Sequence, residues 1–167
     1  PIQAAYEVLK IRETVKDQKE FQELTQLAIL NFKKVLNAAP NDTAFNQVMG
    51  VLYAEANQPQ EAINYFNKSI KLLPRNPLYA YYSLGQEYLK LKQNKLAIRA
   101  LALQGFVDPS FLTSPLWNQP SLATIKQPVV KETLTLFTTL LNSLNPDDSR
   151  ARIVTENITL LRWWFNL

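Results

Sequence analysis

The chain has 167 residues, of which 47% are hydrophobic and 19% are charged, and its formal net charge is +4. These values fit one compact domain or a short repeat array and exclude a disordered chain. The absence of cysteine and histidine excludes disulfides, thiol redox chemistry and the usual serine and cysteine triads. Composition therefore favours a protein that is not an enzyme and that carries no cofactor and no metal. No apolar stretch is long enough to span a membrane.

The N-terminal part of the chain, up to Pro40, predicts helical structure. Apolar residues at helical spacing mark a segment over residues 4–12, and a polar run separates it from a long amphipathic segment that ends before Pro40. Residues 4–18 form either a poor first helix of a helix pair or part of one long helix that caps the array. The sequence leaves both arrangements open.

A spacing of a small residue, a bulky apolar residue and a proline recurs three times along the chain. The copies are Ala28, Phe32, Pro40; Ala62, Phe66, Pro74; and Ala97, Leu101, Pro109. The offsets are four and eight residues in every copy, and successive copies begin 34 and 35 residues apart. A fixed period of this length predicts a stacked helical solenoid, in which each unit buries its apolar face against its neighbours.

The second and third copies each predict a complete helix pair, over about residues 43–76 and 78–109. In both pairs a glycine, Gly50 or Gly85, precedes the small residue of the second helix by twelve positions. Because glycine has no side chain, we expect each one at a close crossing of the two helices.

Short-range signals punctuate these pairs. Asp42 is expected to cap the first helix of the second copy, and Asn57 is expected to take a left-handed conformation in the turn. Asn76 and Pro77 are expected to begin the third copy as cap and first helical residue.

After Pro109 the register fails. Prolines are too dense over residues 110–127 for one long helix, so this stretch predicts a capping segment with short helical turns. Residues 128–167 predict an antiparallel helical hairpin, begun by Pro128, with a turn over residues 145–149. We expect this hairpin to close the C-terminal end of the array.

At these positions the chain resembles the tetratricopeptide repeat (TPR) family, whose pattern is a W-x2-L-G-x2-Y helix followed by an A-x3-F helix ending in proline. Leu84, Gly85 and Tyr88 match the first helix of that pattern. The resemblance implies an all-α fold, a right-handed helical solenoid (α-α superhelix) over residues 1–109 with a C-terminal helical cap. Lys16 stands where the family has glycine, so the first repeat is degenerate.

The resemblance also implies a concave groove lined by the first helix of each pair, which binds peptides or extended protein segments in the family. Register places six polar or aromatic residues there: Gln47, Glu55, Tyr79, Tyr82, Gln86 and Lys90. For Tyr79 and Tyr82, binding and packing are equally expected, whereas Tyr81 is expected in the core. Ala44 and Val51 stand where a carboxylate clamp for chaperone tails needs polar residues, so that subtype is rejected.

Three consecutive aromatic residues, Trp163, Trp164 and Phe165, stand near the C-terminus. They cover most of the circumference of a helix, so at least one is expected to be exposed. Trp163 and Trp164 are therefore a candidate contact surface for a further segment, a membrane surface or a second copy of the chain, which would make a homo-oligomer. The alternative is a domain edge from which a longer chain was cut.

These observations predict a non-catalytic protein–protein interaction module, a TPR adaptor or scaffold that binds a peptide or protein segment in its groove. Two alternatives are a recruiting or regulatory domain of a larger, membrane-tethered enzyme, and a secretion or assembly chaperone. A nucleic-acid partner is not expected, because no alternation of aromatic and basic residues typical of RNA recognition occurs. Because the chain begins at Pro1, we expect a processed form or a piece of a longer protein. We expect it to be cytoplasmic or to face the cytoplasm, and its parent protein can be membrane-anchored.

Overall fold

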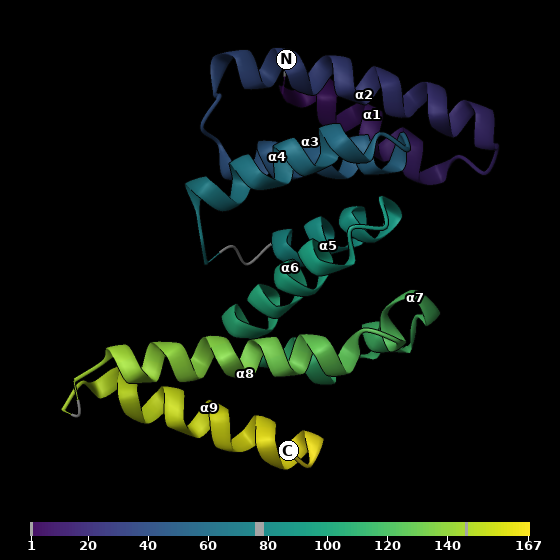
Figure 1. The fold of residues 1–167 in the computed structure, drawn as a ribbon. Coiled ribbons are helices and arrows are strands. Elements are labelled where there is room, and N and C mark those ends of the chain that lie inside the picture. Colours follow the sequence, from purple (N-terminus) through teal and green to yellow (C-terminus); the bar gives the residue numbers. More distant parts are fainter. Residues whose placement is uncertain (1, 76–78, 146) are drawn as a thin grey trace. The chain divides into compact units, whose positions relative to one another are not determined.

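The structure is a computed structural model that describes residues 2–75, 79–145 and 147–167 (Figure 1). Over these residues it is built from helices, without any strand, as the all-α prediction requires. The chain divides into two compact units, residues 1–92 and residues 93–167. The predicted roles of Asn76 and Pro77 lie outside the described residues.

The first unit is a series of helices that pack mainly on their neighbours in sequence. The helices are α1 (Ile2–Thr14), α2 (Gln18–Ala38), α3 (Thr43–Glu55), α4 (Pro59–Leu72) and α5 (Ala80–Lys90). Helix α1 packs on α2, α2 also on α3, α3 on α4, and α4 on α5. Residues 2–14 therefore form a separate helix that pairs with α2, and the alternative of one long capping helix is wrong.

The α3–α4 pair shows why the sequence needs a glycine at its crossing. A side-chain carbon added to Gly50 would overlap the ring of Phe66, whose Cζ atom would lie only 2.9 Å away. Phe66 is 1% exposed, and Ala62, one turn earlier on α4, has no exposed surface. The backbone of α3 thus lies directly against an aromatic side chain of α4, and this close approach holds the pair together.

Local signals at the ends of these helices act as predicted. The Asp42 carboxylate accepts a hydrogen bond from the Phe45 amide at 2.8 Å and so caps α3. Asn57 has φ of 55°, the left-handed region that asparagine tolerates better than most residues. This turn reverses the chain between α3 and α4, and α4 then begins at Pro59.

The second unit begins with α6 (Asn94–Val107) and ends with a helical hairpin. Between them lie two 3₁₀ helices, η1 (Pro109–Thr113) and η2 (Pro115–Asn118), and the short α7 (Pro120–Ala123). The hairpin consists of α8 (Lys126–Ser143) and α9 (Ser149–Phe165), and α8 packs on both α6 and α9. Helix α8 starts two residues before Pro128, which is tolerated because proline fits the first turn of a helix.

The capping segment is anchored by aromatic and polar contacts inside this unit. The indole Nε1 of Trp117 donates a hydrogen bond to the backbone oxygen of Phe111 at 2.9 Å, and the two rings lie 5.2 Å apart. The hydroxyl of Thr133 on α8 donates to the backbone oxygen of Ala102 on α6 at 3.2 Å.

Gly85 belongs to the first unit and Ala97 to the second, so their crossing stays a prediction.

Candidate functional site

Helix α5 and the residue that precedes it carry four of the predicted contact residues. Tyr82, Gln86 and Lys90 follow one another at intervals of four positions, which places their side chains on one side of the helix, and Tyr79 directly precedes α5 with its ring against that of Tyr82. We call these four residues the α5 row. Tyr82 contacts both Tyr79 and Gln86, and all four side chains keep exposed surface. The row is therefore accessible from solvent.

The aromatic half of the α5 row is held in place by its own contacts. The rings of Tyr79 and Tyr82 meet edge to face, with their centroids 6.4 Å apart. The side-chain amide of Gln86 donates a hydrogen bond to the Tyr82 hydroxyl at 2.7 Å. Tyr79 is 37% exposed and has φ of 57°, a left-handed conformation that costs a non-glycine residue about 1–2 kcal/mol. That conformation directly precedes Ala80, the first residue of α5.

The polar half of the row ends on a buried carboxylate that sequence reasoning missed. Glu87 is 3% exposed, and one of its carboxylate oxygens bonds the Lys90 ammonium at 2.7 Å. A buried charge needs such a partner, because its desolvation is otherwise uncompensated. Lys90 also reaches the backbone oxygen of Ala54 at 3.4 Å, which ties α5 to the end of α3. The spacing of three residues between Glu87 and Lys90, which makes side chains neighbours on a helix, could have predicted this pair from the sequence.

Glu55 is tied to a residue far away in the sequence. Its carboxylate forms an ion pair with Arg12 of α1, and Arg12 is 8% exposed. The same guanidinium lies 5.0 Å from the centroid of the Phe21 ring and 3.4 Å from the Thr25 hydroxyl. Glu55 therefore helps to dock α1 and α2 on α3, a structural role that no local spacing announces.

The remaining predicted residues differ in exposure. Gln47 is 7% exposed, so its side chain offers little surface to a partner, although register places it on the face of the first helices. Trp163 is 74% exposed and Trp164 is 36% exposed, while Phe165 is partly covered, with the Lys126 ammonium 5.4 Å from its ring centroid. The contact role of the two tryptophans stays a prediction.

Two kinds of site find no support in the described parts of the chain. No three acidic side chains come together there in a way that could hold a metal ion. None of the helices in those parts combines the length and the apolar character needed to cross a bilayer.

Comparison with known proteins bears on the repeats themselves. The family model for the tetratricopeptide repeat matches residues 44–76 and 78–103. The first match covers nearly all of α3 and α4, and the second covers α5 and most of α6, in the two segments that the sequence period marks as its second and third copies. A search among curated proteins gave no match. Residues 44–76 and 78–103 of this chain therefore match tetratricopeptide repeats, as the sequence resemblance predicted.

Proposed function

We propose that this protein is a non-catalytic interaction module that binds an extended segment of a partner protein along the α5 row and the adjoining end of α3. Tetratricopeptide repeats indicate a protein–protein interaction module. The observation that carries the finer proposal is the continuous, accessible row of Tyr79, Tyr82 and Gln86, which ends at Lys90.

The dimensions of the row suit a short peptide. Tyr79 and Lys90 are eleven residues apart, which corresponds to about 16 Å along a helix. An extended peptide advances about 3.3 Å per residue, so roughly five residues of a partner could lie along the row. The ammonium of Lys90 has three N–H donors, of which Glu87 and Ala54 engage two. The third can bond a backbone oxygen of the peptide.

The two tyrosines are suited to be its anchors. Tyrosine offers a large contact area with few rotatable bonds, so it loses little conformational entropy on binding. The hydrogen bond from Gln86 already fixes the Tyr82 hydroxyl, which lowers the ordering cost further. Glu55 follows Ala54, whose backbone oxygen contacts Lys90 at the end of the row. Its ion pair with Arg12 nevertheless gives Glu55 a structural role before any binding role. We leave Gln47 out of the binding surface because it is buried.

Peptide selection followed by titration tests the proposal. A library of random peptides is panned on the wild-type protein, and the affinities of selected peptides are measured by calorimetry. Tyr82→Ala should weaken their binding by roughly 5- to 30-fold, the scale of one aromatic anchor. Trp163→Ala, which removes an exposed aromatic residue of the other unit, is the matched control and should leave the affinity unchanged.

Far-UV circular dichroism checks that both variants fold. If Tyr82→Ala binds as tightly as the wild type while Trp163→Ala loses affinity, the α5 row is not the site and the C-terminal aromatics take its place.

A further inference from the structure

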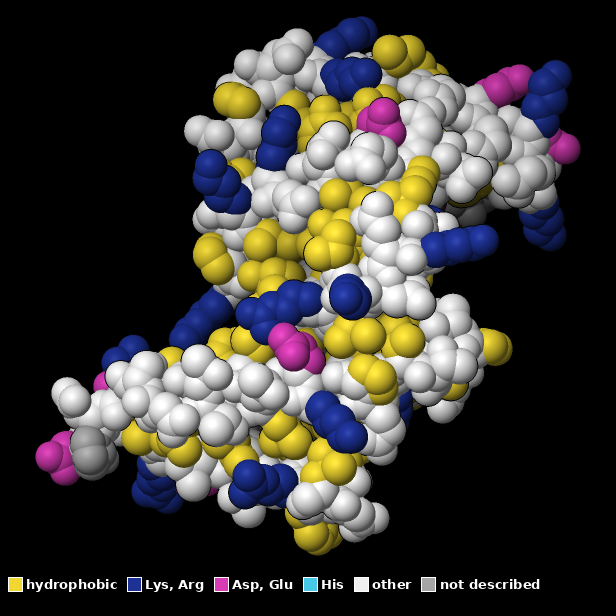
Figure 2. Space-filling model, viewed as in Figure 1, with side chains coloured by type: hydrophobic (Ala, Val, Ile, Leu, Met, Phe, Trp, Pro, Cys, Tyr) yellow, Lys and Arg dark blue, Asp and Glu magenta, His cyan; other side chains and the backbone are white. Residues whose placement is uncertain are grey.

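A second surface of the first unit carries a concentration of positive charge. Helices α2 and α4 end on the same side of this unit (Figure 1), and each has two exposed lysines near that end. They are Lys33 and Lys34 on α2 and Lys68 and Lys71 on α4, which we call the four-lysine face. Figure 2 shows dark-blue side chains over this end of the unit, where no acidic side chain is in view.

The charges of the four-lysine face are not balanced locally. Residues 24–38 of α2 and 62–72 of α4 contain no aspartate or glutamate. None of the four lysines forms an ion pair with a described residue, although other exposed lysines of the unit, such as Lys10 and Lys19, do. Lysines near a helix C-terminus interact favourably with the helix dipole, which explains part of this placement. The dipole does not explain why a pocket lies between them.

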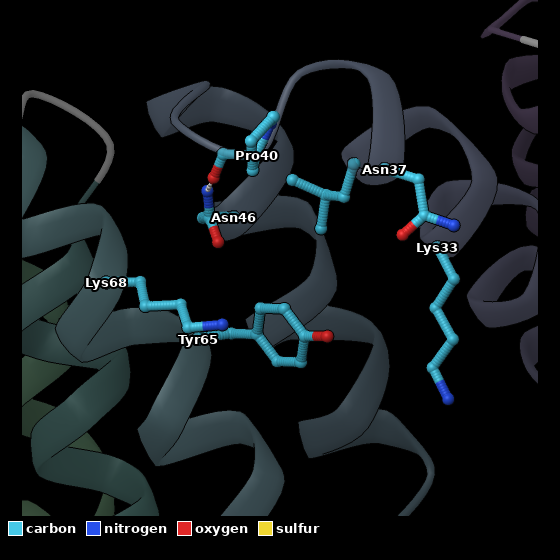
Figure 3. Close-up of a pocket in the computed structure, with 7 residues that line it drawn as sticks. Lys33, Asn37, Pro40, Asn46, Tyr65 and Lys68 are labelled. Atoms are coloured by element: carbon cyan, nitrogen blue, oxygen red, sulfur yellow. Dashed lines mark hydrogen bonds between the residues drawn. The ribbon is translucent and has the colours of Figure 1, made fainter.

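That pocket lies between α2 and α4 and has a volume of about 170 Å³ (Figure 3). Its polar lining comes from Lys33 and Asn37 of α2, from Tyr65 and Lys68 of α4, and from Asn46 of α3. A water molecule occupies about 30 Å³ of liquid, so the pocket has room for a group with several oxygen atoms. No carboxylate lines the pocket, and its available donors are the two ammonium groups, the Asn37 amide and the Tyr65 phenol, since the Asn46 amide nitrogen already bonds the backbone oxygens of Pro40 and Asp42. Such a lining suits an anion.

Stacked aromatic rings hold the two pocket lysines in place. The rings of Tyr53 and Tyr65 stack with centroids 5.4 Å apart and an interplanar angle of 15°. The Lys33 ammonium lies 5.8 Å from the Tyr53 centroid, and the Lys68 ammonium lies 5.0 Å from the Tyr65 centroid. In Figure 3 the Tyr65 hydroxyl points toward the side of the pocket where Lys33 stands. A cation over a ring gains less than one paired with an anion, so both lysines remain available to an anionic ligand.

The protonation states support the same use. Lysine is cationic at neutral pH in any case, and a hydrogen bond with Tyr53 raises the pKa of Lys33 further. The phenol of Tyr65 is likewise protonated at neutral pH and can donate a hydrogen bond, and burial raises its pKa further.

We propose that the four-lysine face binds an acidic segment of a partner protein, with one carboxylate or phosphate group of that segment held in the pocket between Lys33 and Lys68. Lys34 and Lys71, near the same ends of α2 and α4, add positive charge that attracts the neighbouring acidic groups. A protein segment fits better than a membrane, because tetratricopeptide repeats indicate a protein–protein interaction module. It also fits better than nucleic acid, because Tyr65 is already stacked on Tyr53 and is not free to stack on a base. This site is separate from the α5 row and does not depend on it.

Fluorescence anisotropy with defined probes tests the proposal at low ionic strength. The probes are a fluorescein-labelled peptide with a run of glutamates, the same peptide with phosphoserines of equal total charge, and a glutamine version. The wild type should bind the two anionic peptides and not the glutamine peptide. The ratio of the first two affinities tells whether the pocket prefers a carboxylate or a phosphate.

Paired variants separate a built site from long-range attraction. Lys33→Gln/Lys68→Gln should weaken binding of the anionic peptides by about tenfold or more. Lys10→Gln/Lys19→Gln removes the same charge from exposed positions of the same unit and should change binding by less than about threefold. Lys33→Arg/Lys68→Arg keeps the charge and should keep most of the affinity. Circular dichroism confirms that each variant is folded.

Three results would overturn the proposal. The first is a wild type that binds neither anionic peptide. The second is an equal loss in the pocket variant and in the Lys10→Gln/Lys19→Gln control, which would mean that only net charge matters. The third is tighter binding of anionic phospholipid vesicles or of single-stranded RNA than of the peptides, lost in the same pocket variant, which would assign the face to a membrane or to nucleic acid.

Discussion

Replacing Gly50 with alanine tests the contact that holds the α3–α4 repeat together. The added methyl carbon would stand well inside the contact distance of two ring atoms of Phe66 and 2.9 Å from a third. Ordinary carbon–carbon contact is about 3.5–4.0 Å, so the ring or the helix must move. Phe66 is 1% exposed, and its ring therefore has other core atoms around it and no solvent to move into.

Two effects of opposite sign decide the outcome of this change. Alanine is favoured over glycine inside a helix by about 0.5–1 kcal/mol. Forcing an extra carbon into a well-packed core costs about 1–3 kcal/mol. Because the overlap is with a rigid, buried ring, we expect the packing cost to win. Gly50→Ala should lower the free energy of unfolding by about 1–2 kcal/mol.

Urea unfolding followed by far-UV circular dichroism measures this loss. The same change is then made in a Phe66→Leu background, where the ring atoms that cause the overlap are absent. There Gly50→Ala should be neutral or should stabilise the protein, because only the helix preference for alanine remains. A Gly50→Ala protein as stable as the wild type, or an equal loss in both backgrounds, would refute the close crossing.

Two further predictions concern charged groups. Glu55→Gln should lower the free energy of unfolding by about 1–2 kcal/mol in the same urea assay, because Arg12 is 8% exposed and loses its counter-ion. The partial exposure of Glu55 limits the effect. Unchanged stability would contradict a docking role for this pair. Hydrogen bonds from the side chain and backbone of Arg150 lower the pKa of Asp148 from 3.8 to about 2, so the stabilisation of the start of α9 is present above pH 3.8 and is lost as the pH falls through 2. An NMR titration that finds this carboxyl titrating at its ordinary value would disprove the contact, and Asp148→Asn should remove the pH dependence.

The helices and the repeat could be predicted because their signals are local. Helix caps, turns and stops depend on residues within a few positions, as the bond from the Phe45 amide to Asp42 and the positive φ of Asn57 show. The small-residue and glycine positions follow from the repeat period itself, because helices that cross closely need room at fixed places. The sequence could not decide whether residues 2–14 stand apart as α1. That depends on how α1 packs against α2.

The candidate site shows where local signals stop. Register placed Tyr79, Tyr82 and Gln86 on one face of a helix, and the structure gives them mutual contacts there. Register also placed Gln47 toward a partner, yet its side chain is buried, because helical spacing fixes a direction and not what packs against it.

The helical repeat, its period and several helix ends could be predicted from the sequence, since each of these depends on residues near one another along the chain. The pairing of charges and the groups that lie between helices depend instead on how the helices pack. Arg12 and Glu55 are 43 residues apart, and Lys33 and Tyr65 meet from different helices, so no spacing connects them. Helix packing brings such residues together, and the energy of their contacts depends on burial, which is a property of the folded chain alone.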